Sequence, residues 1–320
     1  MSSGNSGSTV GPADCSGSVS VRAKPLIVYI MGDGRSGSTV TSVVLGNHPC
    51  ISSNGELHRF SQFKGYPKRD NEKEEDHRFW QEVRRCYRLE GFSTDFEHLE
   101  DVQGEIENYH NFGRVFFDRV PPDISSEYKA HLLGLFKAIR EVSGRDIIVD
   151  ETKRPGRGYA LLHFQETDVR IIHLVRDPRG VVWSQQKRSV EQKHKSPLTA
   201  AAHYLIKNLM AFLVQLRATR GKVMRVRYED LVREPSRELA RIGQFLGLSM
   251  DPIVAKIEAG EPLRVPILLD GNRIRCQTEI NLQFDDSWRR NLSFGDRLMI
   301  ALITLPFFLL FGYWNYPYDE

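Results

Sequence analysis

The sequence contains little cysteine and no closely spaced cysteine pair. Its four cysteines, Cys15, Cys50, Cys86 and Cys276, are scattered through 320 residues. Because no C-x-x-C pair is present, the sequence indicates neither a zinc site nor a disulfide framework. We expect free thiols and a reducing compartment.

A strong excess of one charge is also missing. The chain has 44 basic and 41 acidic residues, which gives a formal net charge of +3. Dedicated nucleic-acid-binding domains usually carry a large basic excess, so we expect no nucleic acid among the partners. A local basic pocket for a small anion is compatible with this balance. The composition does not indicate an oligomeric state.

Long apolar runs are equally scarce. The first 24 residues are rich in Ser and Gly and lack the apolar core of a secretory signal, so we interpret residues 1–24 as a disordered tail. The most apolar stretch, Leu298–Tyr313, is shorter than the roughly 20 residues of a spanning helix and is interrupted by Pro306. We therefore predict a buried C-terminal helix, no membrane span, and a cytoplasmic localisation.

What the chain does contain is an alternation of apolar strands and amphipathic helices. Short β-branched runs at Pro25–Met31, Asp146–Val149, Val169–Val175 and Lys222–Val226 alternate with helical patterns such as Glu127–Val142 and Ala200–Arg217. Strands alternating with helices predict an α/β fold with a mostly parallel sheet covered on both faces. We assign this domain to residues 25–320, with either a helical insertion or a solvated surface segment around 61–122.

The segment Gly32–Thr39 (GDGRSGST) lies between the first strand and a helix that begins near Ser38. Such a turn directs backbone N–H groups into one concavity at a helix N-terminus, where anions bind. The glycines permit close approach of a phosphate, Ser36, Ser38 and Thr39 add hydroxyl donors, and Arg35 adds a positive charge.

This loop lacks the lysine of an ATP-binding loop. In the pattern G-x-x-x-x-G-K-[ST], Gly32 and Gly37 have the right separation and Thr39 occupies the hydroxyl position, but Ser38 stands where the lysine belongs. That lysine contacts the β- and γ-phosphates in nucleoside triphosphatases. Its absence disfavours a metal-dependent kinase or NTPase.

A second anion motif follows the third strand, in Leu174–Ser184 (LVRDPRGVVWS). The ends of parallel strands are where open α/β sheets bind ligands. Arg176 lies at that edge and Ser184 in the following helix, so the two can hold a phosphate by charge and hydrogen bond. The alternative is a surface salt bridge among Arg176, Asp177 and Arg179.

Together, GDGRSGST and LVRDPRGVVWS resemble the two signature elements of sulfotransferases that use 3′-phosphoadenosine 5′-phosphosulfate (PAPS). The match extends in order from Pro25 to Tyr313, and the loop resembles carbohydrate-type and bacterial members more than cytosolic ones, which carry lysine where Arg35 stands. The resemblance implies a P-loop-like three-layer fold and a PAPS site with no metal. The implied donor-binding residues are Arg35, Ser36, Gly37, Ser38, Thr39, Arg176, Ser184, Tyr228, Asn272 and Arg275.

The resemblance also implies catalytic residues. Charge builds on the bridging oxygen during an in-line sulfuryl displacement, and Arg35 is the candidate cation that stabilises it. Glu56 is the candidate base for the acceptor, with His58 as the rival. Lys153, after the second strand, is a candidate active-site cation, whereas Arg154 and Arg157 beside it are equally well explained as a solvated basic loop.

The sequence thus predicts transfer of a sulfuryl group to a hydroxyl or amine of a carbohydrate, a lipid or a small metabolite. The alternatives are a P-loop kinase or NTPase, and a non-catalytic nucleotide-binding protein. Acceptor pockets are expected from Ser61–Pro122 and Ser189–Pro197, but no pattern in them indicates a chemical class.

Overall fold

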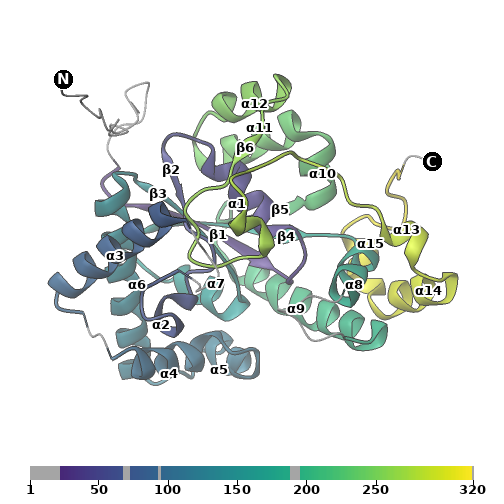
Figure 1. Ribbon diagram of the computed structural model, residues 1–320. Coiled ribbons are helices and arrows are strands. Elements are labelled where there is room, and N and C mark those ends of the chain that lie inside the picture. Colours follow the sequence, from purple (N-terminus) through teal and green to yellow (C-terminus); the bar gives the residue numbers. More distant parts are fainter. Residues whose placement is uncertain (1–21, 68–72, 93–94, 188–194, 319–320) are drawn as a thin grey trace, which may run out of the picture.

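The computed structural model describes residues 22–67, 73–92, 95–187 and 195–318. Most of the predicted N-terminal tail lies outside them. A five-stranded parallel sheet in the order β2-β3-β1-β4-β5 forms the centre (Figure 1). The strands are β1 (Leu26–Gly32), β2 (Ile51–Ser53), β3 (Ile147–Lys153), β4 (Asp168–Val175) and β5 (Val223–Arg227). The predicted α/β class with a parallel central sheet is confirmed.

The central strand β1 is apolar on both faces because helices cover both sides of the sheet. Its residues Ile27, Tyr29 and Met31 pack against α7 (Pro155–Leu161) and α9 (Pro197–Arg217) and belong to the core cluster on that side of the sheet. The alternate residues Leu26, Val28 and Ile30 pack against α1, α11 and α12. This alternation produces the three-layer arrangement seen in Figure 1, with α11 and α12 above the sheet and α3, α4 and α6 below it.

The helices have the following bounds: α1 (Ser38–Gly46), α2 (Arg59–Gln62), α3 (Glu74–Leu89), α4 (Phe96–Glu107), α5 (Phe112–Phe116), α6 (Pro122–Ser143), α7 (Pro155–Leu161), α8 (Pro178–Gln186), α9 (Pro197–Arg217), α10 (Tyr228–Arg233), α11 (Pro235–Leu246), α12 (Asp251–Glu258), α13 (Trp288–Asn291), α14 (Phe294–Ile303) and α15 (Leu305–Leu310). Short 3₁₀ turns lie at Tyr109–Asn111 and Arg273–Cys276, and a small antiparallel pair joins β6 (Leu263–Arg264) to β7 (Glu279–Ile280).

Strand register brings the sequence motifs to one edge of the sheet. Gly32 at the end of β1 is paired with Leu174 of β4, and Met31 is paired with Lys153 of β3 after a register shift. The loop after β1, the end of β3 and the loop after β4 therefore meet at the carboxyl edge, where ligands bind in this class of fold.

The segment around 61–122 contains α3, α4 and α5, and its inner face belongs to the main core. Trp80, Val83 and Tyr87 of α3 are fully buried against α6 and its neighbours. A buried ion-pair network links this segment to the sheet, because Arg157 contacts both Asp150 of β3 and Glu107 of α4 at 2.7 Å. The interpretation of Arg157 as part of a solvated basic loop is therefore wrong.

The prediction of one buried C-terminal helix is also wrong. Leu298–Tyr313 forms parts of two short helices, α14 and α15, which separate at Thr304. Phe307, Phe308 and Phe311 face inward, but Leu302 is 61% exposed. Apolar composition alone does not reveal that, among the described residues, only one side of these helices packs against the protein.

Candidate active site

The loop between β1 and α1 adopts a strained, closely packed conformation. Arg35 has a positive φ of 69°, which is rare for a residue with a side chain, and Gly37 has a φ of 92° at the N-cap of α1. A Cβ atom on Gly37 would lie 2.3 Å from Cδ2 of Tyr228. Glycine is thus required here by the backbone and by the aromatic ring that covers the loop.

The loop also presents an unused hydrogen-bonding group. Ser36 is 1% exposed, and within the described ranges its Oγ has no hydrogen-bond partner. Buried polar atoms are nearly always paired, so an unpaired hydroxyl in a loop that opens onto the N-terminus of α1 fits an anionic ligand. Ser38 and Thr39 form the first turn of that helix, which contains no acidic residue.

Arg176 lies against this loop and makes no ion pair with Asp177. Its Nη1 donates to the carbonyl of Arg35 at 3.0 Å, and its guanidinium carbon lies 4.7 Å from the centre of the Tyr228 ring. Its carboxylate partner is Asp285, at 3.5 Å. The surface salt-bridge alternative therefore fails for Arg176.

Arg179 does form an ion pair with Asp177, at 2.6 Å, but Asp177 is buried, so this pair is not at the surface. Ser184 is half-buried in the second turn of α8, and the Tyr228 hydroxyl donates to the carbonyl of Gln283 at 3.4 Å.

Glu56 is brought to the same edge by a tight turn. Gly55 has a φ of 78°, and a Cβ there would lie 2.3 Å from the carbonyl oxygen of Asp270. The Glu151 amide of β3 donates to the Gly55 carbonyl at 3.0 Å. Held between these two segments, Glu56 accepts a hydrogen bond of 2.6 Å from Nζ of Lys153. Lys153 itself has a φ of 73°, and such strain in non-glycine residues clusters at functional sites.

A cavity of about 310 Å³ joins these groups. Its lining combines the anion loop with the acid–base pair: Gly34, Arg35, Gly37, Ser38, Thr39, Glu56, Arg59, Lys153, Asp270, Gly271 and Asn272. The structure therefore places the predicted loop, Glu56 and Lys153 around one space.

Comparison with known proteins places the chain in a family. The chain matches the sulfotransferase family over residues 25–252. It belongs to the sulfotransferase family. Among curated relatives, carbohydrate sulfotransferase 1 of Mus musculus is 30% identical over 112 residues, which cover 30% of this chain and 27% of the relative. Human carbohydrate sulfotransferase 5 is 27% identical over 48% of this chain and 42% of its own length. The matches thus span less than half of the relatives' length.

Solved structures share the fold. The sulfotransferase domain of the Synechococcus PCC 7002 olefin synthase has a TM-score of 0.53 at 22% identity, covering 90% of this chain and 96% of that domain. The sulfotransferase domain from the curacin biosynthetic pathway has a TM-score of 0.51 at 17% identity, covering 87% and 96%. These neighbours support the predicted P-loop-like fold of this sulfotransferase.

The relatives also correct the predicted cytoplasmic localisation. They are carbohydrate sulfotransferases, not the cytosolic small-molecule type. In addition, the described chain includes one helix, α9, that is long and apolar enough to cross a membrane by length and composition. The expectation of a cytoplasmic protein is therefore withdrawn.

Electrostatics distinguish the two candidate bases of this sulfotransferase. Burial acts to raise the pKa of Glu56, but the neighbouring Lys153 ammonium outweighs it and holds that pKa below the usual value. Burial, with Arg154 and Arg59 nearby, lowers the pKa of His58 well below 6.5. His58 is buried, with its Nδ1 3.8 Å from Glu56. Of the two candidate bases, Glu56 is therefore the one that lines this cavity and is ionised at neutral pH.

Sequence reasoning missed Glu151, which lies under the anion loop. Its Oε1 accepts a hydrogen bond of 3.2 Å from the Thr39 hydroxyl, and burial raises its pKa to about 8. The sequence shows that Glu151 lies two residues before Lys153 in a predicted buried strand. Its contact with Thr39, however, depends on the pairing of β1 with β3.

Two predicted donor-binding residues lie in the loop that follows Gly271. Asn272 lines the cavity, and its side chain accepts from the amide of Ile274 at 2.7 Å. Arg275 is fully buried, and its Nη1 donates to the carbonyl of Gly271 at 3.0 Å. Arg275 thus shapes this loop from behind, and its contact with a ligand stays a prediction.

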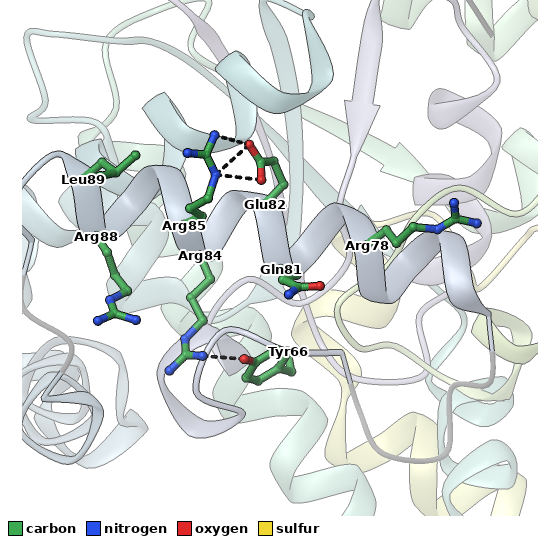
Figure 2. Close-up of a pocket in the computed structure, with 8 residues that line it drawn as sticks. All are labelled: Tyr66, Arg78, Gln81, Glu82, Arg84, Arg85, Arg88 and Leu89. Carbon is green, nitrogen blue, oxygen red and sulfur yellow. Dashed lines mark hydrogen bonds and ion pairs between the residues drawn. The ribbon is translucent and has the colours of Figure 1, made fainter. Parts of the chain in front are cut away.

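Another pocket lies outside this candidate active site. A groove of about 620 Å³ runs along α3 and is lined by four arginines (Figure 2), but Arg85 is paired with Glu82 and Arg84 contacts the Tyr66 hydroxyl. It contains none of the predicted site residues, and we assign it no part in the reaction. Across the described ranges, no group of three or more His, Cys, Asp or Glu side chains is arranged to hold a metal ion.

Proposed function

We propose that this sulfotransferase uses PAPS as donor and transfers the sulfuryl group to a hydroxyl or amine of an acceptor. The observation that carries this proposal is the single cavity that joins the anion loop to the Glu56–Lys153 pair. The Ser36 hydroxyl without a partner among the described residues, the cavity lined by the first turn of α1, and the adjacent Arg176 suit an anionic nucleotide.

In this proposal, the loop from Arg35 to Thr39 holds the 5′-phosphosulfate, and Arg176 with Ser184 holds the 3′-phosphate. The ring of Tyr228, which already covers Gly37 and Arg176, offers a surface for the adenine. Bound PAPS would supply the sulfuryl group on a phosphate leaving group.

The acceptor is activated by Glu56. Its carboxylate is ionised at neutral pH and accepts the proton that the acceptor hydroxyl loses. Lys153 keeps this carboxylate oriented through its 2.6 Å hydrogen bond. Arg35 and the N–H groups of the α1 N-terminus stabilise the negative charge that develops at the leaving group.

The cavity next to Glu56, where the acceptor is expected to bind, is lined mainly by polar and charged groups, which favours a carbohydrate over a lipid. A second cavity, of about 730 Å³, shares Arg59 with the first, and His58 and Arg154 line it beside the Glu56–Lys153 pair. Apart from His58, Asn108 and Arg154, the lining residues belong to α2, α4 and α6, and the lining side chains are charged or polar except Val102 and Ile124. Such a lining offers hydrogen bonds to many hydroxyl groups and little apolar surface. The names of the curated relatives point to the same class.

The test combines turnover with donor binding. Purified protein is incubated with radiolabelled PAPS and a panel of glycan, lipid and small-metabolite acceptors, and binding of adenosine 3′,5′-bisphosphate is measured by calorimetry. Glu56→Gln is expected to lower turnover by roughly 10²- to 10⁴-fold and to keep bisphosphate affinity. A non-catalytic nucleotide-binding protein would show binding but no turnover in any variant.

Arg176→Ala is expected to weaken bisphosphate binding by roughly 10- to 100-fold, because a charge-assisted hydrogen bond contributes about 1.5–3 kcal/mol. Lys187→Ala is the matched control, since Lys187 contacts the same Asp285 from the exposed side of α8. Equal binding by both variants, or magnesium-dependent binding of ATP in place of the bisphosphate, would contradict the proposal.

A further inference from the structure

The exposed apolar side chains of this protein are concentrated in two segments. Fourteen large hydrophobic residues are exposed among the described positions, and eleven of them lie between 198 and 216 or between 294 and 314. Scattered surface leucines are ordinary, but a concentration of this kind marks an interaction site. The eleven are Leu198, Ile206, Leu209, Leu216, Phe294, Leu298, Leu302, Leu305, Leu309, Leu310 and Trp314.

In α14 and α15 the exposed residues follow helical spacing. Phe294, Leu298, Leu302, Leu305 and Leu309 are separated by three or four positions, so within each helix they share a face. The opposite side carries the buried Ile300, Phe307 and Phe311. Helices that are apolar on both sides need a second apolar neighbour in addition to the core.

Helix α9 adds a stripe beside them. Leu209 and Leu216 lie three residues before and four residues after Phe212, whose ring is 6.0 Å from that of Phe307 in α15. Residues at this spacing share one side of a helix. Since α9 also packs against α14, and Phe212 of α9 contacts Phe307 of α15, the stripe lies next to the C-terminal helices. We call this combined surface the apolar face.

Two arginines border this face. Nη1 of Arg225 donates to the carbonyl of the exposed Leu310 at 3.3 Å, and Arg297 lies in α14 next to the exposed Leu298. The acidic residue of this segment, Asp296, accepts a hydrogen bond of 2.8 Å from the Ser293 hydroxyl at the N-terminus of α14. Trp314, which is 66% exposed, adds an aromatic ring of the kind enriched at membrane–water interfaces. Basic charge next to an apolar surface is complementary to an anionic lipid layer.

We propose that the apolar face docks on the surface of an anionic lipid bilayer. The protein lies on the bilayer without crossing it, because α14 and α15 are too short to span one and the inner side of α9 packs in the core. A second copy of the chain fits less well. A two-fold symmetric contact places the same patch on both partners, so the basic residues around the face would meet each other.

The proposal is tested with the full chain and two kinds of vesicle, one of phosphatidylcholine and one in which phosphatidylcholine is mixed with phosphatidylserine. We expect co-sedimentation with the mixed vesicles, weakened by salt, and much weaker binding to phosphatidylcholine alone. The double variant Leu302→Glu with Leu309→Glu is expected to bind roughly tenfold or more weakly. Leu89→Glu is the matched control, because Leu89 is 73% exposed on α3, at the other side of the molecule in Figure 1.

Circular dichroism and thermal melting establish that the variants are folded. If the double variant does not fold, fluorescence provides a second test on folded protein. Vesicles are expected to shift to shorter wavelength the part of the tryptophan emission that is lost in Trp314→Phe. Absence of binding by the wild-type chain, equal binding by the Leu302/Leu309 variant, or a dimer in light scattering that this variant converts to a monomer would each overturn the proposal.

Discussion

Replacing Glu151 with glutamine is expected to stabilise this sulfotransferase at neutral and alkaline pH. Burial raises the pKa of Glu151 from 4.5 to about 8, so the carboxyl under the anion loop keeps its proton in the native state at neutral pH. Glutamine has nearly the same shape and can still accept the hydrogen bond from Thr39. The substitution therefore removes the titration while it keeps the contact.

The sign and size follow from proton linkage. Between about pH 4.5 and pH 8 the native state binds one more proton than the unfolded chain, so the free energy of unfolding falls as pH rises through this window. At about 1.4 kcal/mol for each pKa unit, the loss is roughly 3 kcal/mol by pH 7 and roughly 5 kcal/mol above pH 8. This cost is absent below pH 4.5, where both states are protonated.

Urea unfolding of the wild type and Glu151→Gln at intervals from pH 5 to pH 9 measures this difference. The wild-type curve is expected to fall more steeply with pH than the variant curve, by up to one proton in slope. Parallel curves would refute the reasoning, because they would mean that Lys153 keeps Glu151 ionised in the native state.

The same titration affects the anion loop. Above pH 8 an ionised Glu151 lies beside Thr39, so we expect the affinity for adenosine 3′,5′-bisphosphate to fall through this range in the wild type. Calorimetry between pH 7 and pH 9 measures it, and the Glu151→Gln variant is expected to lose the effect. A decrease of the same size in both proteins would assign it to another group.

Two further substitutions test the supports of the site. Gly37→Ala places a Cβ 2.3 Å from the Tyr228 ring at a positive φ, so bisphosphate affinity should fall roughly tenfold or more, whereas Gly34→Ala, whose Cβ meets nothing within 4 Å, should change little; equal affinities would show that the loop is not packed as described. Arg157→Met removes the cation that contacts the buried Asp150 and leaves Glu107 with the 3.7 Å contact to Arg154, so the free energy of unfolding in urea titrations should fall by about 3–5 kcal/mol. Arg154→Met, at a partly exposed residue, should lower it by under about 1 kcal/mol. Similar losses in both variants would contradict this account.

The sequence was most informative where structure is local. An apolar strand, a glycine-rich turn and a helix follow one another at Leu26–Gly46, so the anion loop could be predicted from its neighbours alone. The fold class followed from the alternation of strands and helices. By contrast, β2 has only three residues, Ile51–Ser53, too few for a periodic pattern to reveal.

Residues whose roles depend on distant partners could not be predicted. Arg157 follows Lys153 in a basic stretch, and only the approach of Glu107 from α4 shows that it is buried. Glu151 becomes a site residue because strand pairing places it next to Thr39. For Arg176, the motif indicated an anion-binding residue, but its packing on Tyr228 and its ion pair with Asp285 depend on segments 52 and 109 residues away.

The C-terminal helices show that a segment too short to span a membrane can still bind to its surface. A spanning segment must be continuously apolar over roughly 20 residues, and Pro306 at the start of α15 interrupts Leu298–Tyr313. Binding at a bilayer surface requires only one apolar side and suitable charge. The break at Thr304 divides the segment into two short helices that bury one side in the protein and leave the other exposed. The break between α14 and α15 therefore makes each helix too short to span a membrane and also leaves the apolar face exposed.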